Sequence, residues 1–210
     1  MIPAGRLSRS RKMTVPCFSD IDVALRGGRR VHIRTVRSSD EGELLQAFQR
    51  LDADARYMRF MRVVGEPNVA QLRKVLASFP ESGIGLVATV PAVDGIDIVG
   101  SALAVVVGSD PASCEFSVTV ARHYGGAGLG HALMSALIAA ARARGLVEME
   151  GFVLRVNGPM LGLASRLGFA LSSDPDDPSV AICRLRLDTA TTNRPVDQRS
   201  RVQGSVQTAS

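Results

Sequence analysis

The sequence is poor in aromatic residues and in lysine. It has no tryptophan and two tyrosines among 210 residues, and aromatic residues make up 4% of the chain. A core must therefore be built mostly from Leu, Val and Ala, which the 46% of hydrophobic residues can supply. Lysine occurs only at Lys12 and Lys74, so arginine carries almost all of the positive charge.

Cysteine is scarce as well, with Cys17, Cys114 and Cys183 far apart and odd in number. This pattern excludes metal sites of the CxxC type, so we expect no metal, and it favours a reducing, cytoplasmic location. No apolar run is long enough to cross a bilayer, because the longest, residues 99–108, has the length of a buried strand. The basic residues 1–14 precede no apolar segment, so we expect neither a signal peptide nor a membrane partner.

The net charge is +5, and basic residues gather near the start of the chain. They form two groups: Arg6, Arg9, Arg11 and Lys12, and then Arg26, Arg29 and Arg30. A solvated basic tail explains them, and nucleic acid is a disfavoured partner because no aromatic residues are interleaved with the charges.

Hydrophobic periodicity divides the chain into three parts. Residues 1–30 have no sustained period and are expected to form a flexible basic arm, and residues 188–210, rich in Thr, Asn, Gln, Arg and Ser, a disordered tail. Residues 31–187 are expected to form one α/β domain, a mixed sheet with helices on both faces.

Hydrophobic periodicity, together with cap and turn residues, predicts the helices and strands of that domain. Asp40 and Glu43 form a capping box for the first helix, Asn68 and Asn157 are N-caps, and Gly145 ends the long helix. Helices are expected from residue 40, over 55–61, from 68 to 79, over 128–144 and from 157. Strands are expected over 31–36, 84–90, 96–107, 114–120, 147–154, 169–172 and 180–187.

A glycine cluster joins the predicted strand 114–120 to the long helix. Gly125, Gly126, Gly128 and Gly130 allow a ligand to approach the backbone closely. The helix behind them presents unpaired N–H groups and the positive end of its dipole. Such a turn is suited to a phosphate or pyrophosphate.

Two common phosphate-binding motifs are excluded. The dinucleotide pattern GxGxxG would need glycine at residue 131 or 133, where the chain has His131 and Leu133. A P-loop would need Gly-Lys-Ser/Thr, which does not follow the cluster.

A third pattern fits, formed by Gly128-Leu-Gly130 after a strand, and later Asn157-Gly-Pro-Met160 and Leu167-Gly168-Phe169. This two-part pattern resembles the GNAT superfamily of N-acetyltransferases. The resemblance implies a largely antiparallel twisted sheet, acetyl-CoA as co-substrate and an amine acceptor. It also implies that the loop amides bind the pyrophosphate of acetyl-CoA.

The opening of the domain and the strand 114–120 extend the resemblance. Residues 33–40, Arg56-Tyr-Met-Arg-Phe60 and Cys114-Glu-Phe-Ser-Val-Thr-Val120 are similar to the acetyltransferase domain of Pat-type protein lysine acetyltransferases. A protein lysine is therefore one implied acceptor, a small amine is another, and a homodimer is left open.

The chain departs from the family pattern at two positions. Gly125 stands where the family usually has Arg or Gln, a side chain worth ~0–1 kcal/mol as an exposed ion pair. The loop should then grip phosphate through backbone N–H groups, each worth ~1.5–3 kcal/mol. Ala164, seven positions after Asn157, stands where a tyrosine often serves as general acid, so the departing thiolate is expected to be protonated by water or to leave unprotonated.

The expected site follows from these motifs. Glu115 is the expected catalytic base, with burial among Phe116, Val118 and Val120 raising its pKa. Cys114 alternates to the other face of the strand and is expected in the core. The expected acetyl-CoA contacts are the strand amides of Val118, Thr119 and Val120, the loop residues Gly125, Gly126, Ala127, Gly128, Leu129, Gly130 and His131, and Asn157.

Three functions compete at this point. The preferred one is acetyl transfer from acetyl-CoA to a primary amine, with a protein lysine as one candidate acceptor, by direct attack assisted by Glu115. Acetylation of a small amine uses the same site. A catalytically silent acyl-CoA sensor is favoured by the departures at Gly125 and Ala164.

Overall fold

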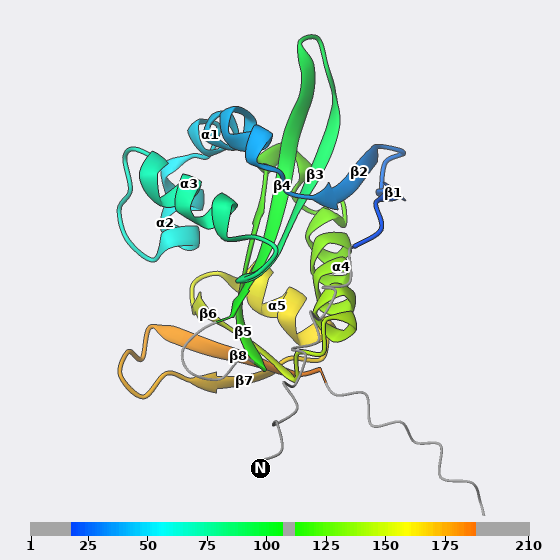
Figure 1. Cartoon of the computed structure of the whole chain (residues 1–210). Helices are drawn as coiled ribbons and strands as arrows, with labels where there is room; N and C mark the ends of the chain where they lie inside the picture. Colours follow the sequence, from blue (N-terminus) through cyan, green and yellow to red (C-terminus); the bar gives the residue numbers. More distant parts are fainter. Residues whose placement is uncertain (1–17, 107–111, 188–210) are drawn as a thin grey trace, which may run out of the picture.

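One eight-stranded sheet, in the order β1-β2-β3-β4-β5-β6-β8-β7, organises the chain (Figure 1). The computed structural model describes residues 18–106 and 112–187. Within these residues β5 and β6 are parallel, and the other neighbouring strands are antiparallel. The expected mixed and largely antiparallel sheet is confirmed.

The strands lie close to their predicted positions, with one addition at the start. They are β1 (Ile21–Ala24), β2 (Arg30–Thr35), β3 (Gly83–Ala92), β4 (Gly95–Val106), β5 (Ser113–Val120), β6 (Glu148–Leu154), β7 (Ala170–Ser173) and β8 (Val180–Arg186).

Helices cover both sides of the sheet. They are α1 (Glu41–Gln49), α2 (Ala53–Phe60), α3 (Val69–Ser78), α4 (Leu129–Ala143) and α5 (Gly158–Arg166), with short 3₁₀ turns η1 (Ser38–Asp40) and η2 (Arg122–Tyr124). Figure 1 shows α1, α2 and α3 on one side of β3 and β4, and α4 on the other. The predicted caps at Asn68 and Asn157 are confirmed, because their side chains accept the N–H groups of Gln71 and Met160.

The core lies between α4 and the sheet. Leu129, Leu133 and Leu137 recur every four residues on one helix face, and all three are fully buried. Gly100 of β4 lies under this face, where an added Cβ would come within 2.9 Å of Leu133 Cδ1. The glycine therefore lets α4 pack closely on the sheet.

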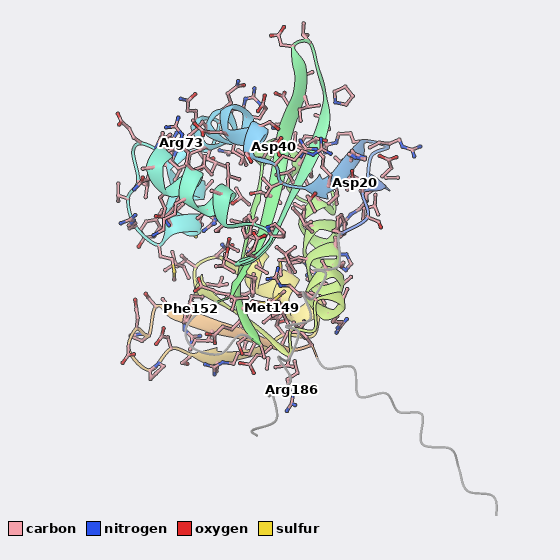
Figure 2. The ribbon with its side chains drawn as sticks, in the orientation of Figure 1. Asp20, Asp40, Arg73, Met149, Phe152 and Arg186 are labelled. Carbon is pink, nitrogen blue, oxygen red and sulfur yellow. The ribbon has the colours of Figure 1, made fainter. Side chains whose placement is uncertain are left out.

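The segment expected as an arm contributes a strand to the sheet. β1 pairs with β2, with Ile21 opposite Ile33 and Ala24 opposite Arg30. The His32 ring lies 2.9 Å from Asp22 and 3.6 Å from Asp20, which is labelled in Figure 2. The flexible-arm prediction is therefore wrong for residues 21–30.

Asp40 does not cap α1 as predicted, although it stands at the N-cap position. Its carboxylate accepts the Arg37 N–H at 2.8 Å and the guanidinium of Arg34. Asp40 therefore joins β2 to the turn before α1, where Figure 2 labels it. Ion pairing with a buried arginine has replaced helix capping, and the Glu43 capping box does not form.

β5 and β6 separate part-way along their length. The two strands pair at residues 113–115 and 148–150, and the last pair is Glu115 with Glu150. The next residues are Phe116 and Gly151, and the Phe116 ring occupies the space of a side chain at residue 151, where an added Cβ would lie 2.5 Å from Cε1. From this point β5 keeps its pairing with β4 and presents its other edge to a gap.

Several predictions concern residues outside the described ranges: Cys17, the basic residues 6–12, Val107 and the tail 188–210. Among the described helices, none combines the length and the apolar character that crossing a bilayer requires.

Candidate active site

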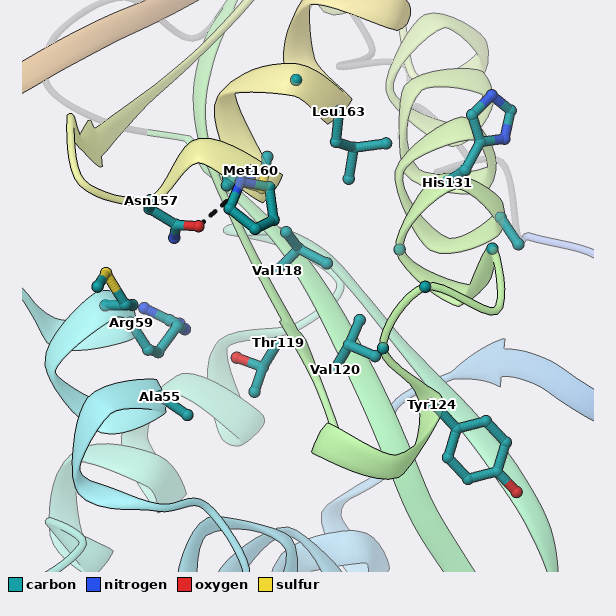
Figure 3. A pocket seen from close by; sticks show the side chains of 18 of the residues that line it. Ala55, Arg59, Val118, Thr119, Val120, Tyr124, His131, Asn157, Met160 and Leu163 are labelled. Carbon is teal, nitrogen blue, oxygen red and sulfur yellow. Dashed lines mark hydrogen bonds between the residues drawn. The ribbon is translucent and has the colours of Figure 1, made fainter.

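A cleft of about 1270 Å³ lies beside the open edge of β5. It is lined by residues of α2, β5, the glycine loop, α4 and α5, and by residues 23–26 at the end of β1 and just after it (Figure 3). The ionisable side chains on its walls include three arginines, Arg26, Arg59 and Arg166, and one carboxylate, Glu115. The lining thus suits a ligand with several negative charges.

The open edge of β5 presents backbone groups to the cleft. The N–H of Ala121 donates to the Val99 carbonyl of β4 at 2.9 Å. Because hydrogen bonding in an antiparallel pair alternates, the N–H of Thr119 also points to β4, while those of Val118 and Val120 point to the open edge. We expected all three amides to face the ligand, and Thr119 is the exception.

The glycine loop closes one end of the cleft. Gly126 (φ 71°) and Gly128 (φ 96°) adopt the left-handed conformation that favours glycine, and Gly128 is the N-cap of α4. The helical hydrogen bonds begin where the Ala132 N–H donates to the Gly128 carbonyl. The N–H groups of the first turn, including Leu129, Gly130 and His131, precede this bond and are available to an anion.

The predicted loop residues differ in what they can offer to a ligand. The side chains of Leu129 and Ala127 are buried in the core, so these residues can offer only backbone groups to a ligand. Gly130 allows α5 to approach, because an added Cβ would lie 3.3 Å from Leu163 Cδ2. Gly125 has φ −56°, which any residue can adopt, so its lack of a side chain is not required by backbone conformation.

Two arginines from the β1–β2 connection support the loop, a role that sequence reasoning missed. The N–H of Arg26 donates to the Ala127 carbonyl at 3.0 Å. Arg29 donates to the His123 carbonyl at 2.5 Å, and its guanidinium lies 4.6 Å from the centroid of the Tyr124 ring. The basic cluster that we assigned to an arm therefore lies against the expected phosphate site.

Glu115 lines the cleft but is exposed, so the predicted burial is wrong. The physical reason is alternation along β5. Phe116 is buried on the α4 face, and Glu115 lies on the opposite face with Ser117. The carboxylate therefore stands at the last β5–β6 pair, at the inner end of the gap.

Arg59 of α2 reaches across to this same face of β5, as Figure 3 shows. Its Nη2 donates to Ser117 Oγ at 2.7 Å. Burial lowers the pKa of the Arg59 guanidinium, and the nearby charge of Glu115 acts in the opposite direction. The contact joins residues 58 positions apart, and no local sequence pattern indicates it.

Cys114 is a core residue, as predicted. Its side chain is fully buried, and burial raises the pKa of the thiol to about 12. It lies on the opposite face of β5 from Glu115. A thiol that holds its proton this strongly is a poor nucleophile at neutral pH, which argues against an acyl-cysteine intermediate.

The remaining predicted residues lie on the wall formed by α4 and α5. His131 is exposed on the first turn of α4, with Nδ1 3.4 Å from Ser135 Oγ. Asn157 lines the cleft and caps α5 through a 3.2 Å bond from the Met160 N–H. Ala164 is fully buried in the core and does not itself line the cleft.

Across residues 18–106 and 112–187, no three His, Cys, Asp or Glu side chains gather as metal ligands would.

Comparison with known proteins decides the family. The sequence profile described as "Acetyltransferase (GNAT) domain" matches residues 30–170. The chain belongs to the GNAT acetyltransferase family. It is also 32% identical to "Acetyltransferase PA5475" of Pseudomonas aeruginosa over 164 residues, which are 78% of this chain and 88% of that protein.

Solved structures share the fold. The GNAT domain of S. lividans PAT superposes with a TM-score of 0.73 at 19% identity, covering 80% of this chain and 96% of that one. A phosphinothricin acetyltransferase of Sinorhizobium meliloti, solved in complex with AcCoA, gives 0.61 at 19% identity, covering 80% and 94%. The arrangement of strands and helices around the cleft is thus that of GNAT acetyltransferases.

Proposed function

We propose that this chain transfers the acetyl group of acetyl-CoA to a primary amine in the cleft beside β5. The observation that carries the proposal is the separation of β5 from β6 directly after Glu115, beside a positive-φ glycine loop at the start of α4. The gap can receive an extended arm, and the loop can receive phosphate. Family membership supports acetyl transfer as the reaction.

The cofactor is proposed to lie along the open edge of β5. Its pyrophosphate oxygens would accept hydrogen bonds from the backbone N–H groups of the loop, from Gly126 to His131, at the positive end of the α4 dipole. Its pantetheine amides would pair with the free backbone groups of Val118 and Val120, like an added strand. The thioester would then lie near Glu115, where the β5–β6 gap closes.

Arg26 is proposed to replace the side chain that is missing at Gly125. Its backbone is bonded to the loop at Ala127, and the residue lines the cleft. A guanidinium from this position can reach phosphate oxygens that the loop amides hold. The loop would then bind phosphate through its amides and one charge from the β1–β2 connection, and not through backbone alone.

Glu115 is proposed as the base. An amine with a pKa near ~10.4 is protonated at neutral pH, so it must lose a proton before or during attack. The amine nitrogen attacks the thioester carbonyl carbon, the C–N bond forms, and the C–S bond breaks. The amine proton passes to Glu115, directly or through water, and solvent protonates the thiolate, whose pKa is near ~8.5.

The resemblance to Pat-type enzymes implies a protein lysine acceptor in the cytoplasm, and a small amine is the alternative within the same chemistry. Calorimetry with acetyl-CoA, alongside a thiol-release assay over peptide lysines and small amines, tests the proposal. Binding with acceptor-dependent release supports acetyl transfer. Binding without release for any acceptor indicates a silent acyl-CoA sensor, and absence of binding contradicts both.

A further inference from the structure

Two arginines of the described residues, the buried Arg34 and the half-buried Arg59, differ in their partners. Arg34 makes two 2.8 Å bonds to Asp40 and one of 3.0 Å to the Thr35 carbonyl. Arg59 makes one hydrogen bond, to Ser117 Oγ, and lies 5.1 Å from the Phe60 ring. Among the described residues, no carboxylate forms an ion pair with it.

This leaves most of the Arg59 guanidinium without a protein acceptor. A guanidinium has five N–H donors, and the Ser117 bond uses one. Arg59 is half-buried without an anionic partner, and even partial withdrawal of a charge from water has a cost; burial accordingly lowers the pKa of its guanidinium. A ligand anion with planar, two-oxygen geometry would remove this cost.

The position of Arg59 separates it from the proposed phosphate site. It contacts β5 at Ser117, four residues before Ala121, so the start of the glycine loop lies roughly 13 Å further along the strand. It also approaches the face of β5 opposite to α4, whose first turn is the proposed phosphate site. Arg59 therefore lies near Glu115, at the end of the cleft where the thioester is proposed to react.

Glu115 and Ser117 lie on the same face of β5, two residues apart and roughly 7 Å between Cα atoms. A carboxylate and a half-buried cation thus stand side by side on the wall of the cleft. Such a pair fits a molecule that carries an amine and an anion a few bonds apart, with the amine toward Glu115.

We propose that Arg59 binds a carboxylate of the acceptor, so that the acceptor is a free amino acid or a similar small amine with a carboxylate close to its nitrogen. This inference rests on the proposed acetyl transfer and names its substrate class. The side chain of a protein lysine brings no anion: four methylenes separate its amine from the backbone, whose carbonyl is uncharged. It would leave Arg59 unpaired.

The test compares acceptors that differ only in this anion. Thiol release from acetyl-CoA is measured with free L-amino acids, with their carboxamides, and with peptides that carry an internal lysine. At least one free amino acid should exceed its carboxamide about 10- to 100-fold in kcat/KM, because the amide leaves the half-buried charge unpaired. Equal or better turnover of carboxamides or peptides overturns the inference.

Variants assign the effect to Arg59. Arg59→Gln should bring acid and amide within a few-fold of each other, and Arg59→Lys should restore part of the preference. Arg62→Gln is the matched control, since Arg62 is exposed just beyond α2. Loss of acid and amide turnover in equal measure in Arg59→Gln, with Arg59→Lys no better, would indicate a structural role and contradict the assignment.

These outcomes differ from failure of the proposed function. If acetyl-CoA binds and peptides or carboxamides are acetylated regardless of Arg59, acetyl transfer stands and the carboxylate site is wrong. If acetyl-CoA releases no thiol with any acceptor, the acetyl transfer itself is contradicted, and the acceptor site falls with it.

Discussion

Arg34 and Asp40 form a buried two-point ion pair, with Nη1 and Nη2 each 2.8 Å from a carboxylate oxygen. The side chains are 7% and 5% exposed, and Asp40 also accepts the Arg37 N–H. The pair ties β2 to the turn that starts α1, and so positions the helices that cover one side of the sheet.

Asp40→Asn should lower the free energy of unfolding by about 3 kcal/mol, because it leaves the Arg34 charge buried without a counter-charge. Urea denaturation followed by circular dichroism measures this. Glu41→Gln is the control: Glu41 pairs with Arg73 on the surface at 2.8 Å, and its loss should leave the midpoint almost unchanged. Similar midpoints for the two variants would contradict the buried pair.

The same pair should make stability depend on acid pH. Burial alone would raise the pKa of Asp40, but hydrogen bonds from Arg34 and from the Arg37 N–H outweigh it and lower the pKa below 3.8. The unfolded chain therefore binds the proton more readily, so the contribution is full above about pH 5 and is lost as pH falls through the lowered pKa. Unfolding midpoints between pH 6 and pH 2 should fall less steeply in Asp40→Asn than in the parent.

Glu115→Gln should reduce kcat by about 10²–10⁴-fold and leave the acetyl-CoA dissociation constant unchanged, since it removes a base and not a cofactor contact. Glu150→Gln is matched in charge and lies opposite Glu115 in the β5–β6 ladder, where it pairs with Arg184. It should keep its turnover. Unchanged kcat in Glu115→Gln would remove Glu115 from the mechanism.

Arg26→Gln should weaken acetyl-CoA binding about fivefold at low salt, the effect of losing one exposed charge beside a phosphate. Adding Arg at residue 125 in this background should restore binding, because Gly125 has an ordinary φ and only the Arg122 carbonyl, 3.0 Å from an added Cβ, is close. Arg30→Gln serves as control, being exposed at the start of β2. Calorimetry that shows equal losses for Arg26 and Arg30 would refute the specific role.

Prediction from sequence succeeded where a signal is local. The leucine repeat and the glycines marked α4 and its loop, and Asn157 marked the cap of α5. β1 was missed because it has only four residues, too few for a sustained period, and it is held by pairing with β2. In β5, the two-residue period carried a signal that we overlooked. Glu115, Ser117 and Thr119 are polar and alternate with apolar residues, which indicates that they share a polar face.

Contacts between segments far apart in the sequence could not be predicted. The bond from Arg59 to Ser117 spans 58 positions, and that from Arg26 to Ala127 depends on the β1–β2 connection lying against the glycine loop. Both come from tertiary packing, and neither leaves a period or a spacing in the sequence.

The short ladder between β5 and β6 divides the sheet into two parts, β1 to β5 on one side and β6, β8 and β7 on the other. Three residue pairs and the packing of Phe116 on Gly151 connect them. An extended ligand arm in the gap would act as a missing length of strand, so the cofactor would also be a mechanical part of the enzyme. Amide hydrogen exchange in β6 and β8 should then slow on acetyl-CoA binding, far beyond the residues that the ligand touches.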